Sequence, residues 1–307
     1  MLETVTALLI ATIIAATPLL LAATGELVAE KSGVLNLGVE GMMLVGAVSG
    51  FIGVQVTGSG TLGIVAAALA GALMALVFAF LTLGLKANQV ATGLALTLFG
   101  IGLSALMGKD FVGTPHDRLP QLAVPGLSDL PVIGPLLFGH DALVYLALAL
   151  VAAVHWFLYH TRRGLVLRAV GENHDAAHAI GYPVLRIRLM ATLFGGAMSG
   201  LGGAYLSLAY TPQWAENMTA GRGWIALALV VFATWKPGRV LVGAWLFGGV
   251  TLGQLYGQGL GIPVPSQFMA MLPYLATVLV LVAISRDRVR IRLNAPACIG
   301  KTFHPAA

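Results

Sequence analysis

The chain alternates between long runs of apolar residues and short polar stretches from one end to the other. Most runs hold about 20 residues, the length of α-helix that crosses the hydrocarbon core of a bilayer. The pattern predicts an all-α membrane protein with one polytopic domain over residues 1–285. The expected spans are Val5–Thr24, Gly38–Val56, Leu62–Lys86, Asn88–Gly108, Ala142–His160, Leu189–Tyr210, Trp224–Trp235, Val240–Gly257 and Phe268–Ser285. The seventh run is short for a complete crossing, so eight and nine spans both fit.

Composition supports this class. Hydrophobic residues make up 58% of the chain and charged residues only 9%. A soluble domain would carry about 25% charged residues, so an ordinary soluble protein is excluded. The single cysteine, Cys298, excludes an intramolecular disulfide and a zinc site built from cysteines.

The basic residues predict the orientation of the spans. When the polar loop 161–188 is placed in the cytoplasm and the spans alternate, only Lys109, Arg118 and Arg222 of the 17 Lys and Arg residues fall outside. Cytoplasmic loops carry an excess of Lys and Arg, and the opposite topology would invert this bias. The loop and the basic tail, residues 286–307, are therefore expected in the cytoplasm. The N-terminus is external if there are nine spans.

A polar, glycine-containing stretch joins the first two spans, from Glu26 to Gly41. A carboxylate at membrane depth normally faces a cavity or a partner, and non-helical backbone is tolerated there only when protein or water surrounds it. Asn36 and Glu40, at the start of the second span, are therefore predicted to line a translocation path beside a broken helix. An ordinary interfacial turn is the alternative, and it is the preferred interpretation for Glu26, Glu30 and Lys31, with all three solvated.

Three uncharged polar residues open the fourth span, Asn88, Gln89 and Thr92. Their donors and acceptors suit a hydroxyl-rich or nucleobase-bearing solute, which makes them further candidates for the path. Helix capping by Asn88 explains the same residues equally well.

Two pairs of apolar segments resemble each other. Residues 70–76 are similar to 195–201, and residues 92–99 to 223–232. The second pair runs in opposite directions in the expected topology, which is the mark of an inverted repeat with a transport path between its halves. Chance similarity between apolar segments is the alternative.

The loop 161–188 is expected to contain a short helix from Glu172 to Ile180. Its small alanines would let that helix seat in a groove of another protein, and a structured cytoplasmic loop suggests a soluble partner. His174 and His178 lie four residues apart, a spacing that suits a metal ion. The sequence offers no third or fourth ligand, so no metal site is predicted.

Enzyme signatures are missing. Ser199 does not lie in a G-x-S-x-G sequence, and there is no H-E-x-x-H motif. Ile299–Thr302 resembles the end of a phosphate-binding loop, but Ala295 stands where the leading glycine belongs. The spans hold almost no charged residues for a proton or sodium relay. Three classes stay open: a transport subunit driven by a separate ATPase, a stand-alone channel or secondary transporter, and a membrane enzyme using His140, His155 or His160.

Three blocks of sequence carry a family resemblance. Gly25–Met43, GELVAEKSGVLNLGVEGMM, resembles the opening signature of ABC-importer permeases of the simple-sugar and nucleoside branch, a group related to ribose and branched-chain amino acid permeases. Residues 167–177 with Gly181 are similar to the cytoplasmic coupling loop of that family, and residues 223–230 to a third block. The form Asn-Leu-Gly-x-Glu-Gly is closer to the nucleoside importers than to the ribose or amino acid permeases.

The resemblance implies a multi-pass permease in the bacterial inner membrane that moves nucleosides or related simple sugars by alternating access. It also implies three protein partners: a second homologous permease, a periplasmic or lipid-anchored binding protein, and a cytoplasmic ATPase that binds the ATP. No cofactor is expected in this chain. The coupling role then falls on Glu172, Asp175, Ala176, Ala177 and Gly181. The path role of Asn36, Glu40, Asn88, Gln89 and Thr92 is inferred from the residues themselves.

Overall fold

The computed structural model describes residues 2–122, 126, 128, 130, 132–259, 265–285 and 294–304. Within these residues the regular structure is helical, and only isolated β-bridges accompany it. The helices are α1 (Leu2–Lys31), α2 (Val39–Thr57), α3 (Gly60–Ala79), η1 (Phe80–Gly84), α4 (Gln89–Gly108), η2 (Lys109–Phe111), α5 (Ile133–Phe138), α6 (Ala142–His160), α7 (Arg162–Glu172), α8 (His174–Ala179), α9 (Val184–Tyr205), η3 (Leu206–Tyr210), α10 (Arg222–Phe232), α11 (Pro237–Gly259) and α12 (Ser266–Ser285).

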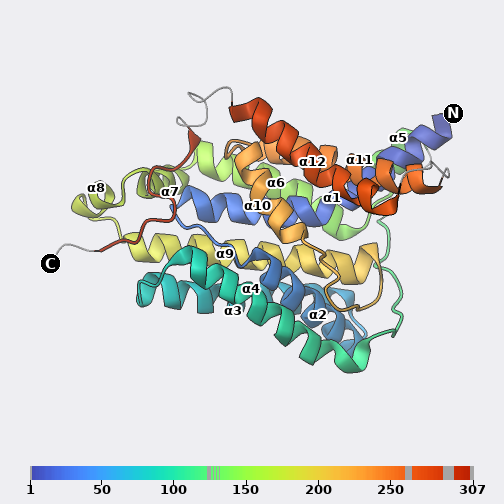
Figure 1. Cartoon of the computed structure of the whole chain (residues 1–307), viewed down its shortest axis with the longest axis horizontal. Coiled ribbons are helices and arrows are strands. Elements are labelled where there is room, and N and C mark those ends of the chain that lie inside the picture. Colours follow the sequence, from blue (N-terminus) through green and yellow to red (C-terminus); the bar gives the residue numbers. More distant parts are fainter. Residues whose placement is uncertain are drawn as a thin grey trace.

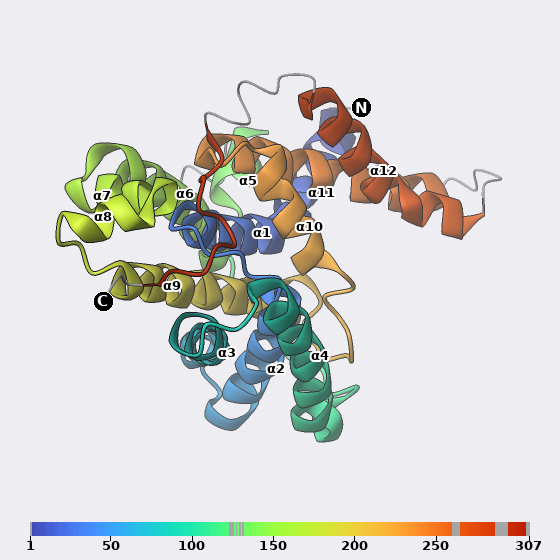
Figure 2. The same ribbon diagram turned by 60° about the vertical axis from the view of Figure 1, so that its left-hand side comes forward.

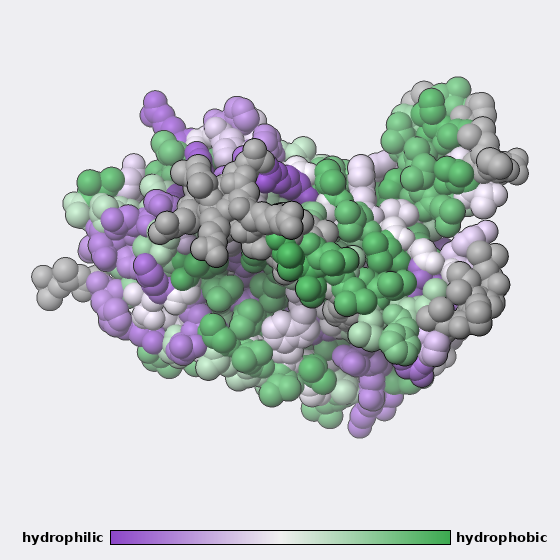
Figure 3. Space-filling view, turned by 45° about the horizontal axis from the view of Figure 1, so that its top comes forward, coloured by the Kyte–Doolittle hydropathy of each residue, from purple (hydrophilic) through white to green (hydrophobic). Residues whose placement is uncertain are grey.

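The long helices run along the long axis of the molecule, and α7, α8 and the C-terminal residues lie at one end of it (Figure 1). The N-terminus and α5 lie at the other end. Hydrophilic residues gather at the α7–α8 end, beside a largely hydrophobic face over the helices (Figure 3). This distribution agrees with a bundle whose apolar sides face lipid and whose basic loops share one side of the membrane.

Seven helical segments in the described part of the chain are long and apolar enough to cross a membrane. They are Thr4–Lys31, Val39–Thr57, Gly60–Gly84, Gln89–Phe111, Ala142–His160, Val184–Tyr210 and Pro237–Gly259. The predicted all-helical, multi-pass architecture is confirmed. The short seventh run forms α10, a helix of 11 residues. It is about 16 Å long, which is shorter than a hydrocarbon core of about 30 Å.

α9 lies at the centre of the bundle, between α1 on one side and α2 and α3 on the other (Figure 2). Glycines bring these backbones together. A Cβ atom added at Gly46 or Gly71 would overlap the backbone of α9, and one added at Gly203 would overlap the carbonyl of Met43. Close backbone approach at small residues holds helices together in lipid, where apolar side chains gain little by leaving lipid tails.

This packing predicts opposite effects for one substitution at two glycines. Gly203→Ala places a methyl group against the Met43 carbonyl, so α2 and α9 must separate, and we expect a loss of about 2 kcal/mol in unfolding free energy. Gly102→Ala is the matched control, because nothing lies within 4 Å of the added atom. There we expect no loss and a gain of up to about 1 kcal/mol from helix propensity. Thermal unfolding of the full chain in detergent measures both, and equal effects would contradict the packing argument.

α1 extends seven residues beyond its expected end at Thr24 and carries Glu26, Glu30 and Lys31 into the protein. All three are buried, so the interpretation of a solvated turn is wrong. Each has a partner from elsewhere in the chain: the Asn36 N–H donates to Glu26, the Trp235 indole N–H to Glu30, and the Lys31 ammonium to the carbonyl of Asn294. Buried charged groups are tolerated when they are hydrogen-bonded in this way.

The connection 109–140 forms a folded loop in its described residues. The N–H of His116 donates to the carbonyl of Pro212 at 3.1 Å, and Gln121 forms a bridge with Asp141. The basic residues Arg286, Arg288, Arg290 and Arg292 of the predicted tail lie outside the described residues.

Candidate functional site

The loop 161–188 folds into two short helices, each with a side-chain cap. The Thr161 hydroxyl accepts from Gly164 N at the start of α7, and the Asn173 side chain accepts from Ala176 N at the start of α8, both at 3.0 Å. Gly181, with φ 92°, follows α8 in the left-handed region that glycine adopts without strain. The predicted short helix is therefore present. It begins at His174 rather than Glu172, because Asn173 caps it.

The five candidate coupling residues divide between two faces. Glu172, Asp175, Ala176 and Gly181 are exposed, and the side chain of Asp175 is 76% accessible. Ala177 is buried in a small cluster with Val170, Val184 and Phe303. The exposed four can contact another protein, whereas Ala177 attaches α8 to the body of the chain.

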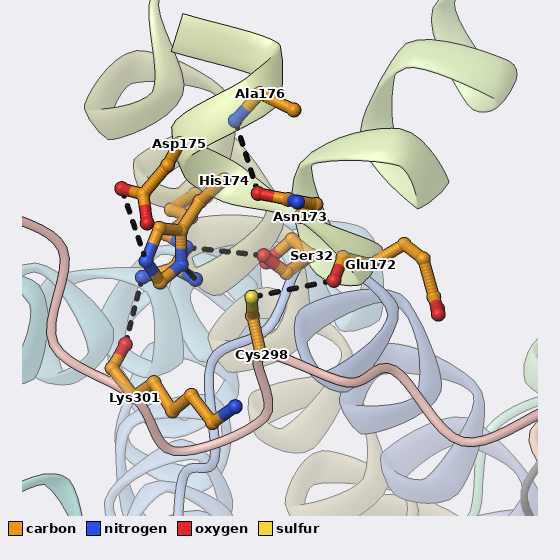
Figure 4. A network of polar contacts seen from close by, with 9 residues as sticks. Ser32, Glu172, Asn173, His174, Asp175, Ala176, Cys298 and Lys301 are labelled. Carbon is orange, nitrogen blue, oxygen red and sulfur yellow. Dashed lines mark hydrogen bonds and ion pairs between the residues drawn. The ribbon is translucent and has the colours of Figure 1, made fainter.

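The C-terminal segment, residues 294–304, lies against this loop (Figure 4). The N–H of Cys298 donates to the Gly171 carbonyl at 2.9 Å, and its thiol donates to the Glu172 carbonyl at 3.4 Å. The N–H of Gly300 donates to the Gly33 carbonyl at 3.1 Å. The ring of Phe303 packs against those of His174 and His178, with centroids 5.2 and 5.3 Å apart. This part of the predicted tail thus joins α7 and α8 to the end of α1.

Arg188, in the first turns of α9, connects all of these elements. Its side chain is fully buried. Nε donates to the Ser32 carbonyl at 3.1 Å, Nη1 to the Lys301 carbonyl at 3.0 Å, and Nη2 lies 2.9 Å from His174 Nδ1. A guanidinium presents several donors in one plane, so one side chain holds α8, α9, the C-terminal segment and the residues after α1 together.

His174 completes this arrangement in its neutral form. Burial lowers the pKa of His174, and the positive charge of Arg188 lowers it further, whereas Asp175 opposes the shift. With Nδ1 accepting from Arg188, the ring proton belongs on Nε2, which lies 3.5 Å from the Asp175 carboxylate. Both ring nitrogens are therefore engaged. The described residues hold no group of three side chains suited to a metal ion.

The α1–α2 break, residues 32–38, is the second feature of the site. The Asn36 N–H donates to Glu26 Oε1 at 3.1 Å, and Glu26 lies five residues before the end of α1. A helix rises about 1.5 Å per residue, so Glu26 lies about 7 Å before the end of α1. The chain of the break therefore folds back beside the last turns of α1. The Asn36 side-chain oxygen accepts from Gly38 N at 2.9 Å. Non-helical backbone within a membrane is stable only when it is buried in protein or lines a water-filled cavity.

α4 covers the other side of the break. Gln89 Oε1 accepts from Leu35 N at 2.8 Å, and the Thr97 hydroxyl donates to the Leu37 carbonyl at 3.0 Å. Gln89 Nε2 is buried without a hydrogen-bond partner among the described residues, as is Glu26 Oε2. Two polar atoms beside the break are thus unpaired.

The remaining path candidates lie apart from these atoms. Asn88 is exposed and caps α4, with its side chain accepting from Ala91 N at 3.0 Å. Thr92 is half-buried one turn further along. The structure therefore brings Asn36 and Gln89 to the same segment, whereas the capping interpretation holds for Asn88.

Glu40 joins the start of α2 to the start of α10. Its carboxylate accepts three hydrogen bonds, from the Thr219 hydroxyl at 2.6 Å, from Gly221 N at 2.8 Å and from Gly223 N at 2.5 Å. It lies in the first turn of its own helix and beside the first turn of α10, and a negative charge is favourable at both helix N-termini. The side chain is buried and fully hydrogen-bonded.

Sequence reasoning missed Arg188 and the role of the C-terminal segment. In the sequence, Arg188 is one of several basic residues of the loop 161–188. The one signal in the sequence is its position: Arg188 directly precedes an apolar run, where a cation has no role in forming the span. The partners of Arg188 are separated from it by 14 to 156 residues, which no local pattern reveals.

Comparison with known proteins gives a consistent result. Residues 8–284 match the family described as permease component of the branched-chain amino acid transport system. The chain is 43% identical over 320 residues to a putative glucose ABC transporter permease protein, TsgC13, of Haloferax volcanii, covering 97% of each chain. It is 32% identical over 285 residues to the guanosine ABC transporter permease protein NupQ of Bacillus subtilis, covering 88% of this chain and 89% of that one. It is 34% identical over 283 residues to the nucleoside ABC transporter permease protein NupC of Lactococcus lactis, with the same coverage. No solved structure matches.

Proposed function

The chain belongs to the family of permease components of branched-chain amino acid transport systems, and on this premise we propose that it imports nucleosides or related simple sugars. It is a multi-pass permease subunit of an ABC transporter and not an enzyme, so the enzyme and stand-alone transporter classes are set aside. The proposal of the solute is supported by the names of three relatives, which refer to glucose, guanosine and nucleosides. Uncharged groups at Asn36 and Gln89 suit such hydroxyl-rich solutes.

The proposed partners are a cytoplasmic ATPase, a second homologous permease and a binding protein outside the membrane. ATP binds to the ATPase, and this chain needs no cofactor. The exposed residues Glu172, Asp175, Ala176 and Gly181 contact the ATPase at the tip of α8. For a bacterial protein the compartment is the inner membrane, with the N-terminus outside.

The proposed mechanism is alternating access driven through α8. Force on α8 passes through the buried Ala177 and through His174 to Arg188, which also holds the Ser32 carbonyl. The α1–α2 break therefore follows the movement of α8. The unpaired Gln89 Nε2 beside the break supports a path there, with Asn36, Gln89, Asn88 and Thr92 along it and Glu40 at its lip.

The span count and the repeat belong to the same proposal. α12 has 20 residues, enough for one more crossing. When α10 with its flanking turns is counted as a passage, the chain crosses nine times, so residues 161–188 and 294–304 share one side and the N-terminus lies on the other. The first pair of similar segments lies on α3 and α9, where Gly71 meets Gly196 and Gly200. The second pair lies on α4 and α10, which both pack on the start of α2, α4 against Gly41 and α10 against Glu40. These contacts support two related halves that meet along α2 and α9.

Reconstitution tests the function. The chain, its second permease and the ATPase are placed in proteoliposomes with ATP at the ATPase face and the loaded binding protein on the other side. We expect ATP-dependent uptake of guanosine or glucose, with each solute tested as a competitor of the other. Uptake by this chain alone, without ATPase, would overturn the proposal.

A bulky residue on α8 should uncouple transport. Ala176→Trp adds a large side chain to the exposed face of α8, so we expect a more than tenfold loss of uptake with normal abundance and thermal stability. Ala142→Trp is the control, because Ala142 is exposed and opens α6, at the end of that helix away from α7 and α8. Full uptake by the Ala176 variant would remove α8 from the coupling interface.

A further inference from the structure

An apolar groove of about 920 Å³ lies between α6, α7 and α9, with α1 at its base. Its walls include Leu150 and Phe157 of α6 and Met190 and Phe194 of α9. Leu150 and Phe157 are seven residues apart, so the groove follows about 10 Å of α6. Met190 is 62% exposed. Because these residues belong to membrane-spanning helices, the groove opens towards the lipid.

Three arginines line the end of this groove that faces away from the membrane core. Arg162 and Arg163 begin α7, and Arg186 precedes the apolar part of α9. All three are exposed, and none of the residues described as lining the groove is acidic. Among the described residues the structure gives these guanidiniums no hydrogen bond and no ion pair. They are also on the side of the membrane that the basic residues predict to be cytoplasmic.

Helix stability does not explain this placement. A cation in the first turn of a helix is unfavourable against the helix dipole, yet α7 carries two there, and Thr161 already caps the helix. An anion beside Arg162 and Arg163 would reverse the penalty, because it is attracted by both guanidiniums and by the helix N-terminus.

We propose that this groove binds an anionic phospholipid of the cytoplasmic leaflet. An acyl chain occupies the apolar walls of α6 and α9, and the phosphate is held by Arg162, Arg163 and Arg186. Guanidinium groups bind phosphate oxygens through paired hydrogen bonds, and basic pockets between membrane helices on the cytoplasmic side suit such headgroups. The bound lipid contacts α7 and α9, the two elements that flank α8, and so lies next to the helix that receives force from the ATPase.

The test measures lipid retention by the full-length protein after delipidation in detergent, by native mass spectrometry. We expect phosphatidylglycerol to bind at a concentration at least tenfold lower than phosphatidylcholine with the same chains. Glycerol phosphate, which carries the headgroup charge without acyl chains, should not be retained. Equal retention of the two phospholipids, or retention of glycerol phosphate alone, would overturn the proposal.

Two double variants with the same loss of charge separate the groove from general basicity. Arg162→Gln with Arg163→Gln should lower phosphatidylglycerol affinity at least tenfold and leave phosphatidylcholine binding unchanged. Lys86→Gln with Lys301→Gln removes two exposed charges outside the groove and should change neither. Equal losses in both variants would contradict a specific site.

A protein partner is the competing occupant of the groove, and the assembled transporter distinguishes it. We expect phosphatidylglycerol to stay bound when the ATPase and the second permease are present. Its complete displacement by either subunit would assign the groove to that subunit and overturn the lipid proposal. The solute plays no part in this measurement, so its outcome is independent of the transport assay.

Discussion

Arg188→Met is expected to destabilise the protein and to abolish coupled transport. Methionine keeps much of the apolar stem but removes every donor, which leaves the Ser32 and Lys301 carbonyls and His174 Nδ1 without their partner. Each buried acceptor left unpaired costs about 1–3 kcal/mol. Part of this loss in unfolding free energy is offset, because the variant no longer has to desolvate a buried guanidinium. We expect a net loss of about 2–4 kcal/mol in unfolding free energy and a more than tenfold loss of uptake.

A matched control uses the fact that Lys301 contributes only its backbone. Lys301→Ala keeps the carbonyl that accepts from Arg188 and removes an exposed side chain, so stability and uptake should remain normal. Arg188→Lys keeps the charge but loses the planar arrangement of donors, and an intermediate loss is expected. Thermal unfolding in detergent and uptake in proteoliposomes measure these effects. An Arg188→Met variant with normal melting temperature and uptake would show that the three contacts do not hold α8 to the core.

The membrane helices could be predicted from the sequence because their signal is local. A run of about 20 apolar residues identifies a span without knowledge of its neighbours, and α2, α4 and α6 begin within about one residue of their expected starts. The helix caps of α4 and α8 are local signals of the same kind, because the side chains of Asn88 and Asn173 accept from backbone N–H groups three residues later. Family resemblance drew attention to α8.

The interior of the site could not be predicted, because its contacts join distant residues. The sequence predicts Glu30 to be solvated, whereas in the structure it is buried and accepts a hydrogen bond from Trp235, 205 residues away. The C-terminal segment had the composition of a free basic tail, yet residues 298–303 contact Gly33, Gly171 and His174. A polar residue near an apolar run looks the same in sequence whether it faces water or a buried partner, and only the fold separates the two.

Glu40→Gln is expected to have the second large effect. An amide has one oxygen and a donor NH₂ group in place of two acceptor oxygens, so it cannot accept from Thr219, Gly221 and Gly223 together. At least one buried N–H loses its acceptor, and hydrogen bonds to a charged group are worth about 1.5–3 kcal/mol each. We expect a loss of about 2–5 kcal/mol in unfolding free energy, measured by thermal unfolding, and displacement of the start of α10 from α2.

Three companion measurements show whether Glu40 acts through structure or through the solute. Thr219→Ala removes one of the three hydrogen bonds and should cost about 1 kcal/mol, and its effect should not add to that of Glu40→Gln because the two residues are in contact. Glu216→Gln, at an exposed carboxylate in the same loop, should change stability by less than about 0.5 kcal/mol. If Glu40 anchors the path, Glu40→Gln lowers the maximal uptake rate and the melting temperature together. A raised KM for the solute at unchanged melting temperature would instead make Glu40 a solute ligand and contradict the anchoring role.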